Sequence, residues 1–217
     1  MAEARLLRCG WHAVLVECDG LEQVLAVAEA VRAAVTSSEP GFTEVIDVVP
    51  AATTVLVIVS DNGSVASLRP ALTRVAASAS APTGQRSGDA ETVEIGVRYD
   101  GPDLNEVAVM TGLSRQEVIE AHTGTSWTAA FGGFAPGFAY LTGGDSRLQV
   151  PRRAEPRTAV PAGSVALAGE FSAVYPRSSP GGWQLVGRTD AVIWDLDRDP
   201  PALLRPGVVV RFVELEP

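Results

Sequence analysis

The chain has 217 residues, of which 46% are hydrophobic, enough for one large domain or two small ones with a sizeable core. A formal net charge of −9 argues against a general nucleic-acid-binding protein, and we expect no nucleic-acid partner. No apolar run approaches the roughly 18 residues that a membrane span needs, so we predict neither a signal peptide nor a membrane partner.

The basic and sulfur-containing residues narrow the chemistry further. All 17 basic residues are arginine, so the chain lacks both the lysine of a P-loop and the lysine of Schiff-base catalysis. Arginine still binds carboxylate or phosphate through two parallel hydrogen bonds. The cysteines, Cys9 and Cys18, flank one predicted strand and are too far apart for a disulfide. Because no zinc-ligand spacing is present, we expect no metal and a reduced, cytoplasmic protein.

The first half of the chain predicts a small domain of strands and amphipathic helices. Its expected elements are a strand over 12–18, a helix over 21–35, strands over 43–49 and 54–59, and a helix that Ser64 can cap. The order β-α-β-β-α, with a possible closing strand, is that of a ferredoxin-like split βαβ unit. We find no catalytic grouping here, since Val-rich strands and helix faces usually form a core.

A small, polar segment separates this half from the next. Residues 76–91 contain Pro and Gly and little that can be buried, which predicts a linker. We therefore predict an N-terminal domain with its linker over residues 1–88 and a C-terminal domain over 89–217.

The second half begins with a predicted strand over 93–99 and two short helices. Pro102 suits the first turn of one helix, and Gly112 its C-cap. Ser114 begins the next helix with a capping box, and that helix ends near His122. A histidine in a last helical turn has two interpretations, and the sequence leaves both open. The helix C-terminus favours its charged form, or it faces the following loops as a proton donor or acceptor.

Glycine and proline then predict a compact, barrel-like β domain. They recur every few residues over 132–189, so neither a long helix nor a long strand fits. Short strands are expected over 164–167, 171–175, 183–186, 192–196 and 208–215. The loop over 131–141 is rich in aromatic residues whose rings could wall a pocket. We also expect a protein partner to cover the apolar side chains of this loop, which are Phe131, Phe134, Phe138, Tyr140 and Leu141.

Arginine gathers in the same part of the chain. Residues 146–188 hold six arginines against only Glu155 and Glu170, which gives this segment a charge of +4 in an acidic chain. A basic island of this kind is a candidate anion site. The alternative is a solvated surface with arginines at strand ends.

Six sequence elements, in order, resemble one known family. They are GPDL (Gly101–Leu104), EVIEAHT (Glu117–Thr123), GFAPGFAYL (Gly133–Leu141), PRRAEPR (Pro151–Arg157), VPAGSVALAG (Val160–Gly169) and SPGGWQLVGRT (Ser179–Thr189). Together they resemble the B subunit of 5-oxoprolinase, also known as the KipI or allophanate hydrolase subunit 1 family. The resemblance spans most of the chain and is densest after Val93. One departure is Glu170-Phe171, which stands where that family often has Gln-Thr.

The resemblance implies a fold class, partners and a cosubstrate. The expected class is α+β, with an N-terminal ferredoxin-like α/β domain followed by a C-terminal cyclophilin-like β-barrel domain. The implied partners are proteins like the C subunit of 5-oxoprolinase (KipA-like) and like its A subunit. ATP is the implied cosubstrate, bound in the complex, because no nucleotide motif is visible in this chain.

Three functions follow from the resemblance. The first is a subunit of an ATP-dependent 5-oxoprolinase, a lactam hydrolase that is inactive without its partners. Its expected catalytic residues are His122, Arg157 and Arg188, and its expected substrate-binding residues are Phe138, Arg153, Ser164 and Gln184. The second is a KipI-type inhibitor of a histidine kinase. The third is the carboxyltransferase half of an enzyme like urea carboxylase.

Overall fold

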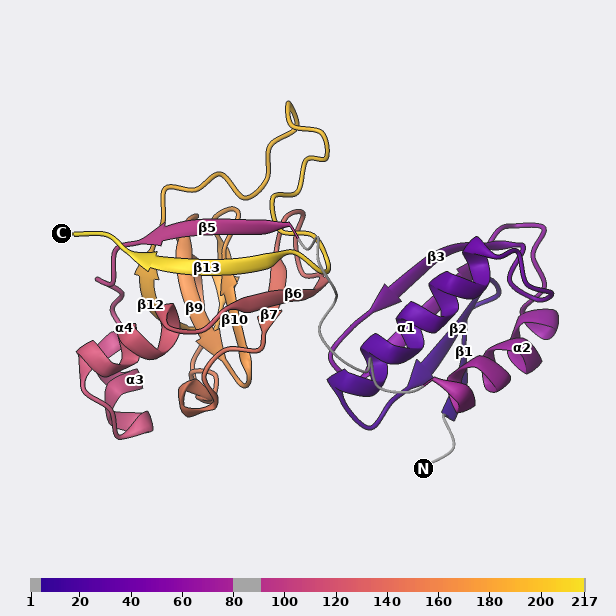
Figure 1. Ribbon diagram of the computed structural model, residues 1–217, viewed down its shortest axis with the longest axis horizontal. Coiled ribbons are helices and arrows are strands. Elements are labelled where there is room, and N and C mark those ends of the chain that lie inside the picture. The colour runs from indigo at the N-terminus through magenta and orange to yellow at the C-terminus, as the bar shows by residue number, and fades with distance from the viewer. Residues whose placement is uncertain (1–4, 80–90, 217) are drawn as a thin grey trace. The chain divides into compact units, whose positions relative to one another are not determined.

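The chain forms two units, Met1–Gln85 and Arg86–Pro217, in a computed structural model that describes residues 5–79 and 91–216 (Figure 1). Both units combine helices and strands, as the predicted α+β class requires. The predicted linker and the boundary at residue 88 fall mostly outside the described residues. The first linker residues, 76–78, are helical instead. None of the described helices is long and apolar enough to cross a membrane.

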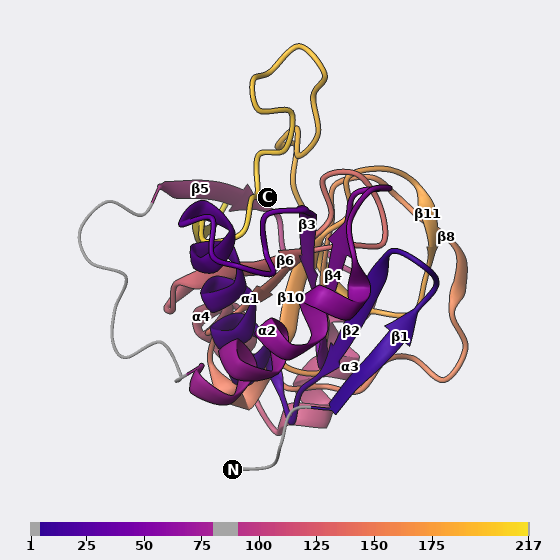
Figure 2. The same ribbon diagram turned by 90° about the vertical axis from the view of Figure 1, so that its right-hand side faces the viewer.

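The first unit packs two helices against one face of a four-stranded antiparallel sheet (Figure 2). Its elements are β1 (Arg5–Cys9), β2 (Ala13–Glu17), α1 (Leu21–Thr36), β3 (Val45–Pro50), β4 (Thr54–Val59) and α2 (Val65–Ser78). The strand order is β1-β2-β4-β3. Alternating valines of β2 and β4 are buried against the apolar faces of α1 and α2. The alternation in the strands and the helical spacing of apolar residues predict this core.

The strand β1 is an addition to the predicted elements. It pairs with β2 along its whole length, with Arg5 opposite Glu17 and Cys9 opposite Ala13. From β2 to α2 the observed order is the predicted β-α-β-β-α. The possible closing strand after α2 would lie outside the described residues, and the ferredoxin-like description of this unit stays a prediction.

The second unit is built on a seven-stranded sheet of order β12-β9-β10-β7-β6-β13-β5, with a separate two-stranded sheet of β11 and β8. Its strands are β5 (Thr92–Val97), β6 (Trp127–Gly132), β7 (Ala139–Thr142), β8 (Arg157–Val160), β9 (Ser164–Ala168), β10 (Phe171–Val174), β11 (Ser179–Gly181), β12 (Gln184–Arg188) and β13 (Val209–Glu214). Its helices are α3 (Leu104–Thr111), α4 (Arg115–Thr123) and the 3₁₀ turn η1 (Ser146–Leu148).

The seven-stranded sheet nearly closes on itself. Its edge strands are β5 and β12, and Figure 1 shows β5, β13 and β6 lying in front of the other four strands. Arg98 and Arg188 exchange two backbone hydrogen bonds of 2.8 and 2.9 Å, which join the two edges. Just beyond, the Gly101 amide donates to the Val186 carbonyl at 3.2 Å. Glycine is needed there because a Cβ would overlap the backbone of β12. The predicted barrel-like sheet is therefore present, and its cyclophilin-like description stays a prediction.

Two short helices cover one end of this sheet (Figure 1). Helix α4 begins with the predicted capping box: the Glu117 amide donates to Ser114 Oγ at 3.2 Å, and the Ser114 amide donates to the Glu117 carboxylate at 2.7 Å. Gly112 ends α3 with a φ of 70°, as a C-cap glycine does. Apolar residues of both helices reach the core between the strands.

The predicted strand over 192–196 is wrong. These residues belong to a long connection between β12 and β13, in which only Trp194 makes a bridge, to Ala202. The alternation of Val192, Trp194 and Leu196 suggested a strand, yet Val192 and Leu196 are exposed. A strand needs a neighbouring strand to bond with, and the two edges of the sheet are already joined to each other through Arg98 and Arg188.

Candidate anion-binding site

A buried carboxylate organises the candidate site. Asp103 directly precedes α3, where an aspartate usually caps the helix, but its side chain makes no cap hydrogen bond. Instead, Asp103 Oδ1 accepts hydrogen bonds from Arg153 Nη1 at 2.9 Å and from Arg157 Nη2 at 2.6 Å. Asp103 Oδ2 accepts one from the Leu185 amide at 2.7 Å. We call Asp103, Arg153 and Arg157 the arginine fork.

Three distant segments bring the fork together. The Asp103 amide donates to the Leu185 carbonyl, so the residues before α3 run along the edge of β12. The Arg153 amide donates to the Gly182 carbonyl at 2.7 Å. Arg157 opens β8, opposite Gly181 of β11. Closure of the sheet therefore places one carboxylate between two arginines that lie about fifty positions further along the chain.

The fork retains donors that the protein does not use. The Arg153 and Arg157 side chains are 29% and 23% exposed, whereas Asp103 is 3% exposed. Arg153 Nε and Arg157 Nη1 are buried without a hydrogen-bond partner. Buried polar groups are nearly always paired, so unpaired ones concentrated in one place need an explanation. Both atoms are enclosed by the protein, so a ligand would bond to them only after the two partly exposed arginine side chains turn outwards.

A buried glutamine adjoins the fork. Gln184 is fully buried next to Leu185, and its Nε2 donates to the Pro151 carbonyl at 3.1 Å. Its Oε1 has no hydrogen-bond partner. Among the described residues, five buried side-chain atoms lack a partner, and three of them belong to Arg153, Arg157 and Gln184. The sequence predicted all three as site residues; the structure joins both arginines to Asp103 and places Gln184 directly before Leu185, whose amide also bonds to Asp103. Their roles in binding stay predictions.

Aromatic side chains lie beside the fork. Phe138 is buried, with its ring 5.4 Å from that of Tyr175 and 5.6 Å from that of Trp183. Burial raises the pKa of the Tyr175 hydroxyl, and the charges of Arg152 and Arg157 oppose that rise. Trp183 directly precedes Gln184 in the chain. Phe138 therefore packs among aromatic rings, and its predicted role in substrate binding stays a prediction.

The predicted need for a partner to cover the apolar loop over 131–141 is not supported by the structure. Phe131, Phe138 and Leu141 are buried within their own unit, because β6 and β7 fold this segment against the sheet. Phe134 alone of the five side chains is largely exposed, at 60%. Its φ of 68° is unusual for a bulky residue and marks local strain.

The structure separates Arg188 from the fork's carboxylate. Arg188 ends β12 with its side chain 63% exposed, and its Nε donates to Asp100 Oδ2 at 2.8 Å. Arg157 and Arg188 therefore have different acidic partners. Ser164 is buried on β9, where it pairs in register with Arg188. The predicted catalytic role of Arg188 and the predicted substrate-binding role of Ser164 stay predictions.

His122 lies inside the core. Its Nδ1 shares a 2.7 Å hydrogen bond with the Tyr99 hydroxyl, and its Nε2 shares a 2.9 Å hydrogen bond with the Ser172 hydroxyl. Burial lowers the pKa of His122 to about 3, so the ring is neutral near pH 7. The expectation that the helix end favours its charged form is wrong, because the cost of burying the charged ring exceeds the stabilisation that the helix C-terminus gives it. The ring faces the core and stacks on Phe212 at 4.3 Å.

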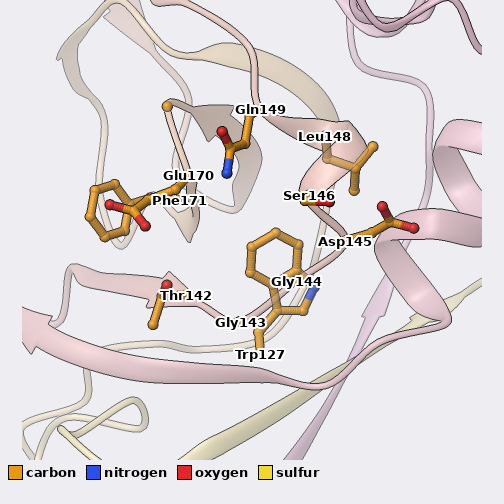
Figure 3. Close-up of a pocket in the computed structure, with 11 residues that line it drawn as sticks. Trp127, Thr142, Gly143, Gly144, Asp145, Ser146, Leu148, Gln149, Glu170 and Phe171 are labelled. Atoms are coloured by element: carbon orange, nitrogen blue, oxygen red, sulfur yellow. The ribbon is translucent and has the colours of Figure 1, made fainter. Parts of the chain in front are cut away.

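A separate pocket of about 210 Å³ lies beside Trp127 (Figure 3). Thr142, Gln149 and Glu170 are among the side chains that line it, so the departure noted at Glu170 falls here. None of the predicted site residues lines this pocket. Within residues 5–79 and 91–216, no group of three or more His, Cys, Asp or Glu side chains is arranged to hold a metal ion.

Asp103 is the residue of the candidate site that sequence reasoning missed. It lies in the GPDL element, but an acidic residue before a helix has the ordinary interpretation of a cap. Only the missing cap hydrogen bond and the two arginine contacts reveal its other role.

Two solved structures share the fold of this chain. The solved structure of Kluyveromyces lactis urea carboxylase aligns with 98% of this chain and 22% of that chain, with a TM-score of 0.74 at 16% identity. The structure of TTHA0988 aligns with 94% of this chain and 40% of that chain, with a TM-score of 0.73 at 35% identity. A nearly closed sheet flanked by short helices is thus a known architecture.

The chain belongs to the family of the carboxyltransferase domain, subdomain C and D, whose sequence profile matches residues 4–204. The 5-oxoprolinase B subunit of Escherichia coli O157:H7 is 51% identical over 124 residues, which are 56% of this chain and 57% of that protein. That of Bacillus subtilis is 48% identical over 126 residues, 57% of this chain and 52% of that protein. The resemblance predicted from the six sequence elements is confirmed. The chain spans about half the length of the curated relatives it matches.

Proposed function

We propose that the chain is a subunit of an ATP-dependent 5-oxoprolinase, which converts 5-oxo-L-proline, ATP and water to L-glutamate, ADP and phosphate. Its proposed partners are proteins like the C subunit and the A subunit of that enzyme. The names of the relatives support this assignment, because a B subunit implies further subunits. The observation that carries it is the arginine fork with its unpaired donors beside Gln184.

The chemistry of the substrate fits these groups. The substrate has a carboxylate and a stable lactam, and phosphorylation of the lactam oxygen turns that oxygen into a leaving group. Arginines can hold the carboxylate or a phosphate through charge-assisted hydrogen bonds. Gln184 Oε1 can accept a hydrogen bond from the lactam N–H. In this proposal Arg153, Arg157 and Gln184 bind and orient the substrate, and Arg188 holds an anionic group at the far end of β12.

His122 can transfer a proton to a substrate only if its buried ring becomes accessible. Its ring is fully enclosed and both ring nitrogens are engaged, by Tyr99 and Ser172. Transfer to a bound lactam would require the end of the barrel near α4 to open. ATP enters the proposal as a substrate of the assembled enzyme, because the chain has no lysine to pair with nucleotide phosphates in a P-loop.

Reconstitution with both partner proteins tests the proposal. Glutamate release is measured for the natural chain and for Arg157→Ala, Arg157→Lys, Arg188→Ala and His122→Ala. We expect Arg157→Ala to lose roughly 10- to 100-fold in turnover, since a charge-assisted hydrogen bond contributes about 1.5–3 kcal/mol. Arg157→Lys should also lose activity, because an ammonium cannot reproduce the planar fork. His122→Ala should lose roughly 100-fold if the ring transfers a proton.

A matched arginine controls for general effects of charge removal. Arg115 is on α4 of the same unit and exposed, and within the described residues its side chain bonds only to Asn105 Oδ1 at 3.2 Å. Arg115→Ala should therefore retain full turnover. Full lactam-cleaving activity in all four test variants would refute the site assignment. Absence of any ATP-dependent glutamate release from the mixture of all three proteins would refute the proposed function.

The family supports one alternative, the carboxyltransferase half of an enzyme like urea carboxylase. Carboxyl transfer from carboxylated biotin to an acceptor, with no lactam cleavage, would favour it. The histidine-kinase inhibitor stays a prediction that no contact in the described residues supports.

A further inference from the structure

We propose that the arginine fork binds a carboxylate monoanion and that the negative charge of Asp103 sets this preference. This inference rests on the proposed function for the identity of the ligand, which is then the carboxylate of 5-oxoproline. Its consequence is that the phosphates of ATP bind elsewhere in the assembled enzyme.

The charge of the fork matches one negative charge. Two guanidinium groups surround one buried carboxylate, which leaves a single net positive charge. Glu106 lies 3.7 Å from Arg153, and the charge of Arg152 acts on Tyr175 beside the fork. Glu106 is half exposed and Arg152 is exposed, so water screens both charges more than it screens Asp103. A monoanion neutralises this site, whereas a phosphate dianion would leave an uncompensated charge in a partly desolvated position.

The unpaired atoms match the same ligand. Asp103 holds Arg153 through Nη1 and Arg157 through Nη2, which leaves Arg153 Nε and Arg157 Nη1 as free donors. Both donors are buried in the structure, and a carboxylate offers them two oxygens once the partly exposed arginine side chains turn towards it. Gln184 Oε1 adds one free acceptor, which suits an N–H donor in the same ligand. Two donors and one acceptor are the complement of a cyclic amide that carries a carboxylate next to its N–H.

Asp103 also fixes the orientation of the fork. Its Oδ2 is held by the Leu185 amide, so the carboxylate is anchored to β12 on one side and to both arginines on the other. The arginines are thereby held before a ligand arrives, which lowers the entropy that binding must overcome. Loss of the Asp103 charge should therefore change which anion the fork prefers.

Calorimetric titration of the full chain tests the inference without the partner proteins. The probes are 5-oxoproline, 2-pyrrolidone, which has the lactam but no carboxylate, and inorganic phosphate near pH 7.5, where it is mostly dianionic. We expect 5-oxoproline to bind at least 10-fold more tightly than either of the other two. Equal or tighter binding of phosphate would overturn the inference, as would an absence of measurable 5-oxoproline binding at millimolar concentrations.

Two variants locate the site and test the role of Asp103 in anion preference. Arg157→Ala should weaken 5-oxoproline binding at least 10-fold, whereas Arg115→Ala should leave it unchanged. Asp103→Asn adds one net positive charge, so we expect the ratio of phosphate to 5-oxoproline affinity to rise about 10-fold. An unchanged ratio in a folded Asp103→Asn protein would overturn the role of Asp103. If that variant does not fold, the Arg157→Ala titration decides alone, and an affinity equal to that of the natural chain refutes the site.

The binding and turnover results are separable. Binding of 5-oxoproline that depends on Arg157, in a chain whose reconstituted complex releases no glutamate, would support the carboxylate site and refute the proposed function. Lactam cleavage that is unaffected by Arg157→Ala would support the function and refute the carboxylate site.

Discussion

Replacement of Asp103 by alanine should destabilise the second unit strongly. The change removes the only carboxylate that is buried against Arg153 and Arg157 among the described residues, and it leaves the Leu185 amide without its acceptor. Removing one partner of a buried ion pair costs about 3–5 kcal/mol, and the two arginine side chains are 29% and 23% exposed, so the low end applies. We expect a loss of about 3 kcal/mol, which includes the unpaired Leu185 amide.

The measurement is thermal and urea-induced unfolding of the full chain, followed by tryptophan fluorescence. For a unit of about 130 residues, 3 kcal/mol corresponds to a fall in Tm on the order of 10 °C. Asp100→Ala is the matched control, because Asp100 pairs with the exposed Arg188 and both side chains are at least half exposed. Surface pairs of this kind contribute about 0–1 kcal/mol. A loss below about 1 kcal/mol in Asp103→Ala, or equal losses in the two variants, would refute the reasoning.

Two further predictions concern the core and the closure of the sheet. Burial lowers the pKa of His122 from 6.5 to about 3, so the unfolded chain takes up a proton that the folded chain refuses between those values. The free energy of unfolding should therefore fall by up to about 1.4 kcal/mol per unit as the pH drops from 6.5 towards 3, and His122→Gln should reduce this slope in urea unfolding. Gly101→Ala should destabilise by more than about 2 kcal/mol, because a Cβ there overlaps the backbone of Leu185 and Val186. Gly112→Ala, which adds only the strain of a positive φ, should cost about 1 kcal/mol, and equal unfolding midpoints for the two glycine variants would contradict the closure argument.

Local patterns in the sequence determined the elements whose signals are local. The capping box of Ser114 and Glu117, the C-cap at Gly112 and the helical spacing over 21–35 each predicted a boundary that the structure confirms. These signals succeed because a helix satisfies its hydrogen bonds within one segment. The ordered motifs also placed Arg153 and Arg157 in one candidate site with five other residues, and the structure joins both arginines to Asp103, while the site itself stays a prediction.

Tertiary structure alone decided the pairing of strands and the environment of single charges. The alternation over 192–196 predicted a strand, but the two edges of the seven-stranded sheet are joined to each other at Arg98 and Arg188. His122 has the position of a charged last-turn residue in sequence, and its burial beside Phe212 makes it neutral. Asp103 precedes a helix as a cap does, and closure of the sheet directs it to two arginines instead. In each case the deciding partner lies far away in the chain, so only the folded backbone brings the two together.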